Sequence, residues 1–379
     1  MAVADLTRNA VDVLPEGALE RKLALGRPLR VKLGIDPTGA DIHLGFASVL
    51  RRLAAFQADG HIAVLIVGDY TARIGDPSGR SKERQVLPDE VLDANARLFA
   101  EQAFRILDRE RTEIRFNGEW LGKLDYAEIV RLTRIGTVAR LLERDDFAKR
   151  FAAQEPISVS ELLYPFAQGY DSVAVEADIE VGGTDQLYNL LMGRDVMEHY
   201  GLEPQAVMTF ELLVGIDGVE KMAKSVGNYV GIDEAPEEQF GKVMSIPDSA
   251  LEQWWRLTLD RDPPASDPME SKLALARGIV ELYHDAEAAR RAVDHFTRVV
   301  REGQAPEEVL EYAHPDKTVY LPQFLAHVFG DSSSHWRRVI DQGGVRVDGQ
   351  TLNDYEIPRA SVDGRIIQAG KRRFVRVTS

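Results

Sequence analysis

Two lysines three positions apart, Lys221 and Lys224, have the residue type and spacing to bind phosphate groups. They lie in a stretch bracketed by Gly218 and Gly227, and two ammonium groups on a loop suit the β- and γ-phosphates of a nucleotide. The alternative is a solvated lysine pair, which is the commoner case for such a pair in isolation. A second anion-binding stretch elsewhere in the chain would favour the nucleotide.

Such a stretch, Asp36-Pro-Thr-Gly-Ala-Asp-Ile-His-Leu-Gly45, follows an apolar run at residues 29–35 and leads into a helix expected from about residues 41–42. A strand that turns through glycines into a helix start aims free N–H groups and the positive end of the helix dipole at one point. That arrangement suits phosphate. His43 and Thr38 add side-chain donors there. Taken alone the stretch could be an ordinary turn, but beside the lysine pair it favours a nucleotide site.

The fold has to bring the two stretches together, and the first one lies in a strand–helix–strand pattern. Residues 44–59 carry apolar side chains at helical spacing, and Gly60 ends that pattern. Residues 61–69 form a β-branched apolar run, which predicts a second strand after the one at 29–35. This unit predicts a parallel sheet whose ligand lies at the carboxyl ends of the strands.

The remaining elements extend this α/β pattern. We expect further helices at residues 5–25, 91–107, 129–142 and 187–199, strands at 173–181 and 207–214, and mainly helical structure over 80–150 and 236–311. The end of the chain differs in character. A linker at 315–317 is expected to precede a small α+β module with helices at 321–329 and 335–342, a hairpin at 343–349 and strands within 366–377.

Composition limits the kind of protein. The chain has 379 residues, of which 44% are hydrophobic and 28% charged, as is typical of a globular protein of two or three domains. It has no cysteine, no apolar run long enough to span a membrane and no signal-peptide block. We therefore expect a cytoplasmic protein without disulfides or thiolate metal sites.

The net charge of −15 is unevenly distributed. From Tyr320 to the last residue nine Lys and Arg oppose six Asp and Glu, so this segment carries +3 and the rest of the chain −18. A basic module on an acidic body is a common arrangement for separate RNA-binding and catalytic units. Chance clustering on a solvated face is the alternative.

Several motifs, in order along the chain, carry a family resemblance. Ile42-His-Leu-Gly-Phe46 is similar to the HIGH signature, and Lys221-Met-Ala-Lys-Ser225 to the KMSKS signature, of class I aminoacyl-tRNA synthetases. The resemblance narrows to the bacterial tyrosyl enzymes through Leu33-Gly-Ile-Asp-Pro-Thr38, Gly75-Asp-Pro-Ser-Gly79, Tyr164-Pro-Phe-Ala-Gln-Gly-Tyr-Asp171 and Gly182-Gly-Thr-Asp-Gln186. The segment from Trp336 to Gly349 resembles the small RNA-binding domain that ends those enzymes.

This resemblance implies a Rossmann-type parallel-sheet catalytic domain at residues 1–230 with a helical dimer insertion at about 80–150. A helical anticodon-binding domain at 231–317 and a small α+β RNA-binding domain at 318–379 would follow. The implied activity is that of a tyrosine–tRNA ligase, which activates L-tyrosine with ATP to tyrosyl-adenylate and pyrophosphate and then transfers tyrosine to the 3′ end of tRNA(Tyr). ATP would enter with Mg²⁺ as a substrate complex. The resemblance implies a homodimer. It implies neither a protein-bound metal nor a membrane partner.

The resemblance also assigns roles by position. Stabilisation of the phosphates during catalysis would fall to His43, Thr38, Lys221 and Lys224. ATP would bind at Gly45, Phe46, Gly183, Asp185, Lys221, Lys224 and Ser225. Tyrosine would bind at Lys32, Asp76, Tyr164, Gln168, Asp171 and Gln186. Transfer RNA would bind at Arg337, Arg338, Arg346, Lys371, Arg372 and Arg373.

Within the tyrosine set, Asp76, Tyr164 and Gln168 would surround the α-ammonium group, and Asp171 would accept a hydrogen bond from the phenolic hydroxyl. A buried acceptor dedicated to that hydroxyl would be left unpaired by phenylalanine, which would explain its rejection. A turn, cap or core position is the alternative for each of these residues.

Two residues depart from the family pattern. Phe46 stands where the HIGH signature has its second histidine, which removes a polar group expected near the ribose. Lys32 stands where many bacterial tyrosyl enzymes have a tyrosine beside the substrate hydroxyl, and its ammonium would either favour a phenol oxygen or pair with an acidic neighbour.

Two other functions stay open. Phe46 supports a catalytically impaired paralogue that binds RNA through residues 320–379. A nucleotidyltransferase of the same superfamily, acting on a small phosphorylated substrate, would leave the basic C-terminal segment unexplained.

Overall fold

The structure is a computed structural model that describes residues 3–37, 39, 41–78, 88–264, 267–301, 309–314, 316–370 and 373–378. The chain divides into two compact units, which we call the first unit (Met1–Ala235 with Lys242–Leu275) and the second unit (Pro236–Gly241 with Ala276–Ser379). The three-domain division at residues 230 and 317 stays a prediction.

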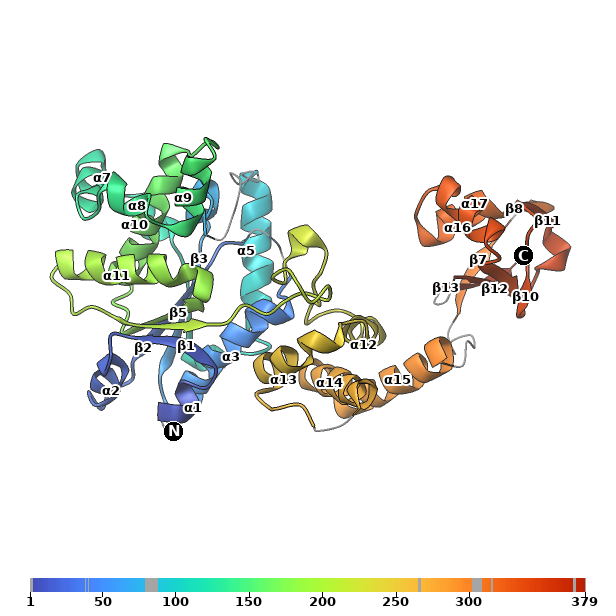
Figure 1. Ribbon diagram of the computed structural model, residues 1–379, viewed down its shortest axis with the longest axis horizontal. Coiled ribbons are helices and arrows are strands. Elements are labelled where there is room, and N and C mark those ends of the chain that lie inside the picture. The colour runs from blue at the N-terminus through green and yellow to red at the C-terminus, as the bar shows by residue number, and fades with distance from the viewer. Residues whose placement is uncertain are drawn as a thin grey trace. The chain divides into compact units, whose positions relative to one another are not determined.

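A six-stranded sheet forms the centre of the first unit (Figure 1). Its strand order is β1-β6-β5-β2-β3-β4, and all neighbouring pairs are parallel except β1 with β6. The α/β class with a parallel sheet is therefore confirmed. The strands are β1 (Ala10–Leu14), β2 (Arg30–Ile35), β3 (Ile62–Val67), β4 (Thr112–Phe116), β5 (Ile179–Gly183) and β6 (Ala206–Phe210).

The predicted strand–helix–strand unit consists of β2, α3 (Leu44–Ala58) and β3. Every residue of β3 from Ala63 to Val67 is at most 1% exposed. Both faces of this strand are therefore covered, which explains why its sequence is a continuous apolar run without alternation.

Helix α10 (Val159–Ala174) packs against α11 (Leu187–His199). It begins at a capping box in which the Ser158 and Glu161 side chains satisfy each other's backbone N–H groups. The other helices of the first unit are α1 (Val3–Leu6), α2 (Ala18–Leu23), α4 (Thr71–Ile74), α5 (Asp89–Ala103), α6 (Gly118–Leu121), α7 (Tyr126–Thr133), α8 (Val138–Leu141), α9 (Asp145–Ala152) and α13 (Leu251–Leu259). Two helices, α12 (Pro236–Met244) and α14 (Pro268–Tyr283), have residues in both units.

Four expectations about the first unit are wrong in detail. The single helix expected at 5–25 is instead α1 and α2 on either side of β1, which forms one edge of the sheet. Strand β4, the other edge, lies within the region expected to be helical; its sequence is half polar because none of its residues is fully buried. The strand expected at 173–181 begins only at Ile179, because α10 continues to Ala174. The helix expected at 129–142 is interrupted between α7 and α8.

The second unit contains α15 (Ala286–Phe296), α16 (Leu321–Phe329) and α17 (Ser333–Asp341). It also has a five-stranded sheet of order β10-β9-β12-β13-β7 and a two-stranded sheet of β11 and β8. The strands are β7 (Leu310–Ala313), β8 (Thr318–Tyr320), β9 (Val345–Val347), β10 (Gln350–Thr351), β11 (Glu356–Pro358), β12 (Ile366–Ala369) and β13 (Arg373–Thr378).

The C-terminal part of the second unit has a hydrophobic core of its own, built around Leu325, Trp336, Ile340 and Val375. The two predicted short helices correspond to α16 and α17, and β9 with β10 forms the predicted hairpin. Strand β7, which lies in the region expected to be helix and connector, pairs in parallel with β13. Of the linker expected at 315–317, Pro315 lies outside the described residues.

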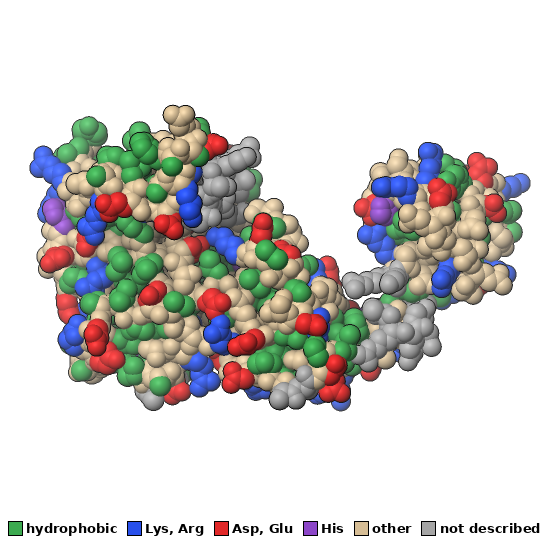
Figure 2. Space-filling model, viewed as in Figure 1, with side chains coloured by type: hydrophobic (Ala, Val, Ile, Leu, Met, Phe, Trp, Pro, Cys, Tyr) green, Lys and Arg blue, Asp and Glu red, His purple; other side chains and the backbone are tan. Residues whose placement is uncertain are grey.

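The visible faces in Figure 2 carry side chains of both charges among apolar and polar ones. Across the part of the chain that the structure describes, no helix is both long and apolar enough to cross a bilayer. Two charged side chains, those of Lys32 and Arg150, are fully buried inside the first unit, and each is paired with a carboxylate.

Candidate active site

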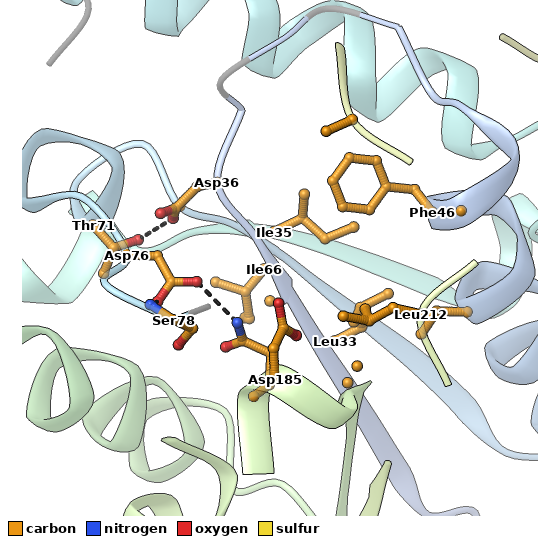
Figure 3. Close-up of a pocket in the computed structure, with 18 of the residues that line it drawn as sticks. Leu33, Ile35, Asp36, Phe46, Ile66, Thr71, Asp76, Ser78, Asp185 and Leu212 are labelled. Atoms are coloured by element: carbon orange, nitrogen blue, oxygen red, sulfur yellow. Dashed lines mark hydrogen bonds between the residues drawn. The ribbon is translucent and has the colours of Figure 1, made fainter. Parts of the chain in front are cut away.

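A cavity of about 450 Å³ opens where β2, β3 and β5 end, at the carboxyl edge of the parallel sheet. Apolar side chains of the strands, among them Leu33, Ile35 and Ile66, form its floor (Figure 3). What we call the inner end is lined by Asp76, Tyr164, Gln168, Asp171 and Gln186. What we call the lysine end is lined by His43, Phe46, Asp185, Lys221 and Lys224.

The structure brings most of the predicted site residues to this one cavity. Besides the residues of the two ends, Gly45, Gly183 and Ser225 also line it. Thr38 lies outside the described residues. Lys32 is not among the residues that line the cavity.

Asp171 provides a buried, oriented acceptor at the inner end. Its carboxyl group is almost inaccessible to solvent, and burial raises its pKa to about 7. The indole N–H of Trp120 donates to Oδ1 at 2.8 Å, and the Asn117 amide donates to Oδ2 at 3.2 Å. Each oxygen still has a lone pair, so the carboxylate can accept a hydrogen bond from a ligand in the cavity.

Tyr164 and Gln168 contribute further oxygens to the inner end. The Tyr164 hydroxyl donates to Asp36 Oδ2 at 3.0 Å, and Thr71 donates to Asp36 Oδ1 at 2.7 Å (Figure 3). Burial, with Asp36 beside it, raises the pKa of Tyr164 well above its usual value, so the group stays a neutral phenol. Gln168 donates through its amide nitrogen to Glu180 at 3.2 Å, which leaves its amide oxygen as the acceptor. Together with Asp76, these oxygens suit a ligand ammonium group.

Lys32 lies behind Gln168 and not in the cavity. Its ammonium is fully buried, lies 2.9 Å from Glu180 Oε1 and donates to Ser172 Oγ at 2.7 Å and to the Gln168 carbonyl at 3.0 Å. An ammonium has three N–H donors, and these three partners use them all. Of the two possibilities considered for Lys32, the structure supports the pair with an acidic neighbour, and the prediction of a direct ligand contact is not supported.

The lysines at the other end are paired with carboxylates of the cavity wall. Lys221 Nζ donates to Asp185 Oδ2 at 2.8 Å. Lys224 forms an ion pair with Asp41, and its hydrogen bond lowers the pKa of that carboxyl group. Asp217 and Asn228 hold the base of the loop: Asp217 accepts hydrogen bonds from the backbone N–H groups of residues 219 and 220, and Asn228 donates to Asp217.

His43 joins the start of α3 to the segment after the lysine loop, because its backbone forms a β-bridge with Gly231. Burial, together with the charge of Lys224, lowers the pKa of His43 to about 4, so the imidazole is neutral at pH 7. Its ring stacks on that of Phe46, with 4.4 Å between centroids and 26° between planes. Phe46 is 36% exposed and faces the cavity, next to the edge of the Phe99 ring.

Sequence reasoning missed Asn117 and Trp120, the two residues that orient Asp171. Asn117 is fully buried; it also donates to Thr71 Oγ1 at 3.0 Å and accepts from the backbone N–H of Tyr70 at 3.0 Å. It follows β4 directly, at the same edge of the sheet as the other loops. The alternation of residues 112–116 before Asn-Gly is the signal that would have found it.

In the second unit, the described basic residues predicted to contact RNA are all exposed. Arg337 donates to the Tyr320 hydroxyl at 2.9 Å. Arg373 pairs with Asp331 at 2.7 Å and lies over the Trp336 ring, 5.2 Å from its centroid. Arg338 and Arg346 project from α17 and β9, while Lys371 and Arg372 lie outside the described residues.

Within the described ranges, no three His, Asp or Glu side chains are placed to hold a metal ion. The carboxylates of the cavity are instead hydrogen-bonded to Trp, Asn, Gln, Tyr and Lys side chains, as described above.

Comparison with known proteins agrees with this geometry. Residues 24–300 match the family model for class I tRNA synthetases (W and Y). The chain is 46% identical to a tyrosine–tRNA ligase of Geobacter sulfurreducens, with all of both chains covered. It is 45% identical to the ligases of Moorella thermoacetica and Thermotoga maritima, over 98% of this chain and 94% and 96% of theirs.

Solved structures show the same fold at lower identity. The tyrosyl-tRNA synthetase of Archaeoglobus fulgidus, complexed with L-tyrosine, is similar with a TM-score of 0.64 at 23% identity, covering 77% of this chain and all of that one. A truncated mitochondrial tyrosyl-tRNA synthetase of Aspergillus nidulans gives a TM-score of 0.62 at 20% identity, over 77% of this chain and 92% of that one.

Proposed function

This chain belongs to the class I tRNA synthetases of the tryptophan and tyrosine group and is a tyrosine–tRNA ligase, and we propose that tyrosine is activated in the cavity described above. Its substrates are ATP, tyrosine and tRNA. The catalytically impaired RNA-binding alternative has no support in these comparisons, and Phe46 alone does not sustain it.

The observation that carries the assignment of the cavity is the buried carboxylate of Asp171. An acceptor held by Trp120 and Asn117 at the inner end is suited to the phenolic hydroxyl of tyrosine. Phenylalanine would fill the same space and leave that carboxylate without its partner, at a cost of about 1–3 kcal/mol or more. Tyrosine is thus selected by an interaction that its closest analogue cannot make.

The α-ammonium group of tyrosine is proposed to lie among Asp76, Tyr164 and Gln168. A carboxylate, a phenol oxygen and an amide oxygen supply one charge and three acceptors for its three N–H groups. Gln186 donates to Asp76 at 2.9 Å and is proposed to face the carboxylate of the bound tyrosine, which is the reacting group. Lys32 supports Gln168 from behind.

ATP is proposed to occupy the lysine end, with Asp185 at the ribose, Gly45, Gly183 and Phe46 beside the nucleoside, and Ser225 near the phosphates. The tyrosine carboxylate attacks the α-phosphorus, and the bond to the bridging oxygen breaks as pyrophosphate leaves with the electron pair. Because a carboxylate is already a nucleophile, no protein base is needed. Catalysis then rests on positioning and on stabilisation of the phosphate charge by His43, Thr38, Lys221 and Lys224.

Mg²⁺ is proposed to enter with ATP on the pyrophosphate group and not to reside on the protein. In the second step the terminal ribose hydroxyl of tRNA attacks the mixed anhydride. We propose that the tRNA contacts the C-terminal segment 318–379 through Arg337, Arg338, Arg346, Lys371, Arg372 and Arg373, and residues 231–317 near the anticodon. A cytoplasmic location is proposed from the absence of cysteine.

A homodimer through the insertion at about 80–150 is also proposed. Large apolar side chains are exposed there, including Tyr126 at 82% and Val138 at 59%. These exposed apolar side chains are available to pack against a second copy of the chain. A sedimentation mass of one chain at micromolar concentration would refute the dimer.

Tyrosine-dependent exchange of pyrophosphate with ATP tests the proposed site directly. We expect exchange with tyrosine, none with phenylalanine, and loss of exchange when Asp171 is replaced by alanine. Exchange that survives unchanged in Asp171→Ala would remove tyrosine from the inner end of the cavity.

A further inference from the structure

Arg144 is a buried arginine that lies outside the cavity, between α8 and α9. Its guanidinium lies over two aromatic rings, 5.0 Å from the centroids of both Phe147 and Tyr188. It forms two hydrogen bonds to Asp146, at 3.1 and 2.7 Å. Two carboxylate bonds and two ring contacts leave the guanidinium one orientation.

Another edge of the guanidinium is bonded to Asn189, which lies behind the inner end of the cavity, and to Ser78, which lines the cavity. Nη1 donates to Asn189 Oδ1 at 2.9 Å, and Nη2 donates to Ser78 Oγ at 3.2 Å. Asn189 is fully buried and in turn donates to Ser78 Oγ at 3.1 Å and to Gln186 Oε1 at 3.1 Å.

The chain of bonds ends on the cavity wall. Gln186 donates through Nε2 to Asp76 Oδ2 at 2.9 Å, the bond drawn in Figure 3. Asp76 Oδ1 accepts from the backbone N–H of Ser78 at 2.9 Å. Both oxygens of the Asp76 carboxylate are thus held by residues that Arg144 contacts directly or through Asn189.

The direction of these bonds follows from the chemistry of the first residue. A guanidinium has donors only, so the Asn189 atom facing Arg144 must be its oxygen. The Asn189 nitrogen then faces Gln186, which must present its own oxygen, and the Gln186 nitrogen therefore points at Asp76. If Gln186 were turned over, its oxygen would face the Asp76 carboxylate and repel it.

We propose that Arg144 is a positioning residue for tyrosine: it fixes the amide orientations of Asn189 and Gln186 and thereby the Asp76 carboxylate that receives the substrate ammonium group. This proposal rests on the tyrosine site proposed above. Asp146 balances the charge of Arg144, so the effect on the site is transmitted through hydrogen-bond direction more than through a net field.

The test measures tyrosine affinity by equilibrium binding without ATP, and the KM values of tyrosine and ATP in pyrophosphate exchange. Arg144→Met keeps the length of the side chain and removes every donor. Asn189→Asp keeps a partner for Arg144 but cannot donate to Gln186. We expect each variant to weaken tyrosine binding by about 10- to 100-fold with the KM of ATP within about twofold of the native value.

Arg140→Met is the matched control, because Arg140 lies on α8 and pairs with Asp195 at 3.2 Å on the surface. It should leave both KM values unchanged. If Arg144→Met does not fold, Asn189→Asp tests the proposal in its place, since this variant retains the arginine and its buried ion pair.

Native tyrosine affinity in a folded Asn189→Asp protein would overturn the role of Arg144, and so would equal losses for tyrosine and ATP. Failure of the tyrosine site itself would be distinguishable, because Asp171→Ala would then also bind tyrosine with native affinity.

Discussion

The inner end and the lysine end of the cavity differ in how their polar groups are held. At the inner end Tyr164 and Asp171 are buried, and their partners Asp36 and Trp120 lie directly after β2 and on α6. At the lysine end Lys221 and Lys224 have side chains 42% and 26% exposed, on a loop, and each is paired with one carboxylate.

Because of this difference, we expect the inner end to recognise tyrosine and the lysine end to stabilise the phosphates during catalysis. Ion pairs as exposed as these are worth about 1 kcal/mol or less, so the phosphates of a nucleotide can displace the carboxylates at little cost. The hydrogen bonds at the inner end cannot be exchanged for water without opening the first unit. Selection of tyrosine is therefore expected to be preformed, whereas the groups that stabilise the phosphates must change partners in each cycle.

The largest expected effect is at the inner end. Asp171→Asn replaces one acceptor oxygen by an NH2 group, which then faces the donor of either Trp120 or Asn117. We expect kcat/KM for tyrosine in pyrophosphate exchange to fall roughly 100-fold or more, with a much smaller change for ATP. Asp145→Asn, at an exposed position on α9, serves as the control. A loss confined to the KM of ATP would reverse the assignment of the two ends.

At the lysine end, Lys221→Met and Lys224→Met should each lower kcat for exchange by roughly 100-fold, since each removes a cation proposed to stabilise charge in the transition state. Lys149→Met, whose ammonium is exposed and 3.8 Å from Asp145, is the matched control. Native kcat in both variants would show that the loop takes no part in the chemistry.

The two ends should also respond differently to pH. The pKa of Asp171 is raised to about 7, so below pH 7 its carboxyl group is protonated and loses the charge that strengthens a bond from the phenol. Because a hydrogen bond from the phenol lowers the pKa of Asp171 in the complex, tyrosine affinity should fall about fivefold from pH 7 to pH 6. The KM of ATP should respond less, because the pKa of His43 is about 4.

The raised pKa of Asp171 also makes the free energy of unfolding depend on pH. The folded protein retains a proton on Asp171 that the unfolded chain releases above about pH 4, so this group's contribution is fullest below that pH and is lost as pH rises through about 7. Tyrosine affinity that is flat from pH 6 to 8 would contradict the proposed hydrogen bond.

The smallest expected effect is at Phe46, whose ring offers one face to the cavity. Phe46→Leu keeps an apolar side chain without a π face, and we expect the KM of ATP to rise about fivefold through the loss of stacking. Phe46→His, which restores the signature residue, should recover most of it. A change in tyrosine affinity in either variant would show that the two ends of the cavity are coupled and would contradict their independence.

The sequence predicted the parallel sheet and both loops of the cavity because β2, β3 and α3 follow strong apolar patterns. It did not predict β1 or β4, since both are edge strands without a fully buried residue, and the sequence of β4 is also half polar. Because β4 was not predicted, Asn117, which follows it directly, was not recognised as a site residue.

The sequence also does not show which charged side chains are buried. Arg144 lies in a charged helical segment of the kind that is usually solvated, and only its packing over Phe147 and Tyr188 shows otherwise. The pairing of Lys32 with Glu180 depends on the side-by-side placement of β2 and β5, which no local pattern reports.

Calorimetric titration of tyrosine into the Lys221→Met/Lys224→Met double variant, without ATP, measures whether the tyrosine site is preformed and independent of the lysine loop. We expect a tyrosine Kd within about twofold of the native value in a protein whose exchange activity is lost. A Kd weakened tenfold or more in the folded variant would contradict it.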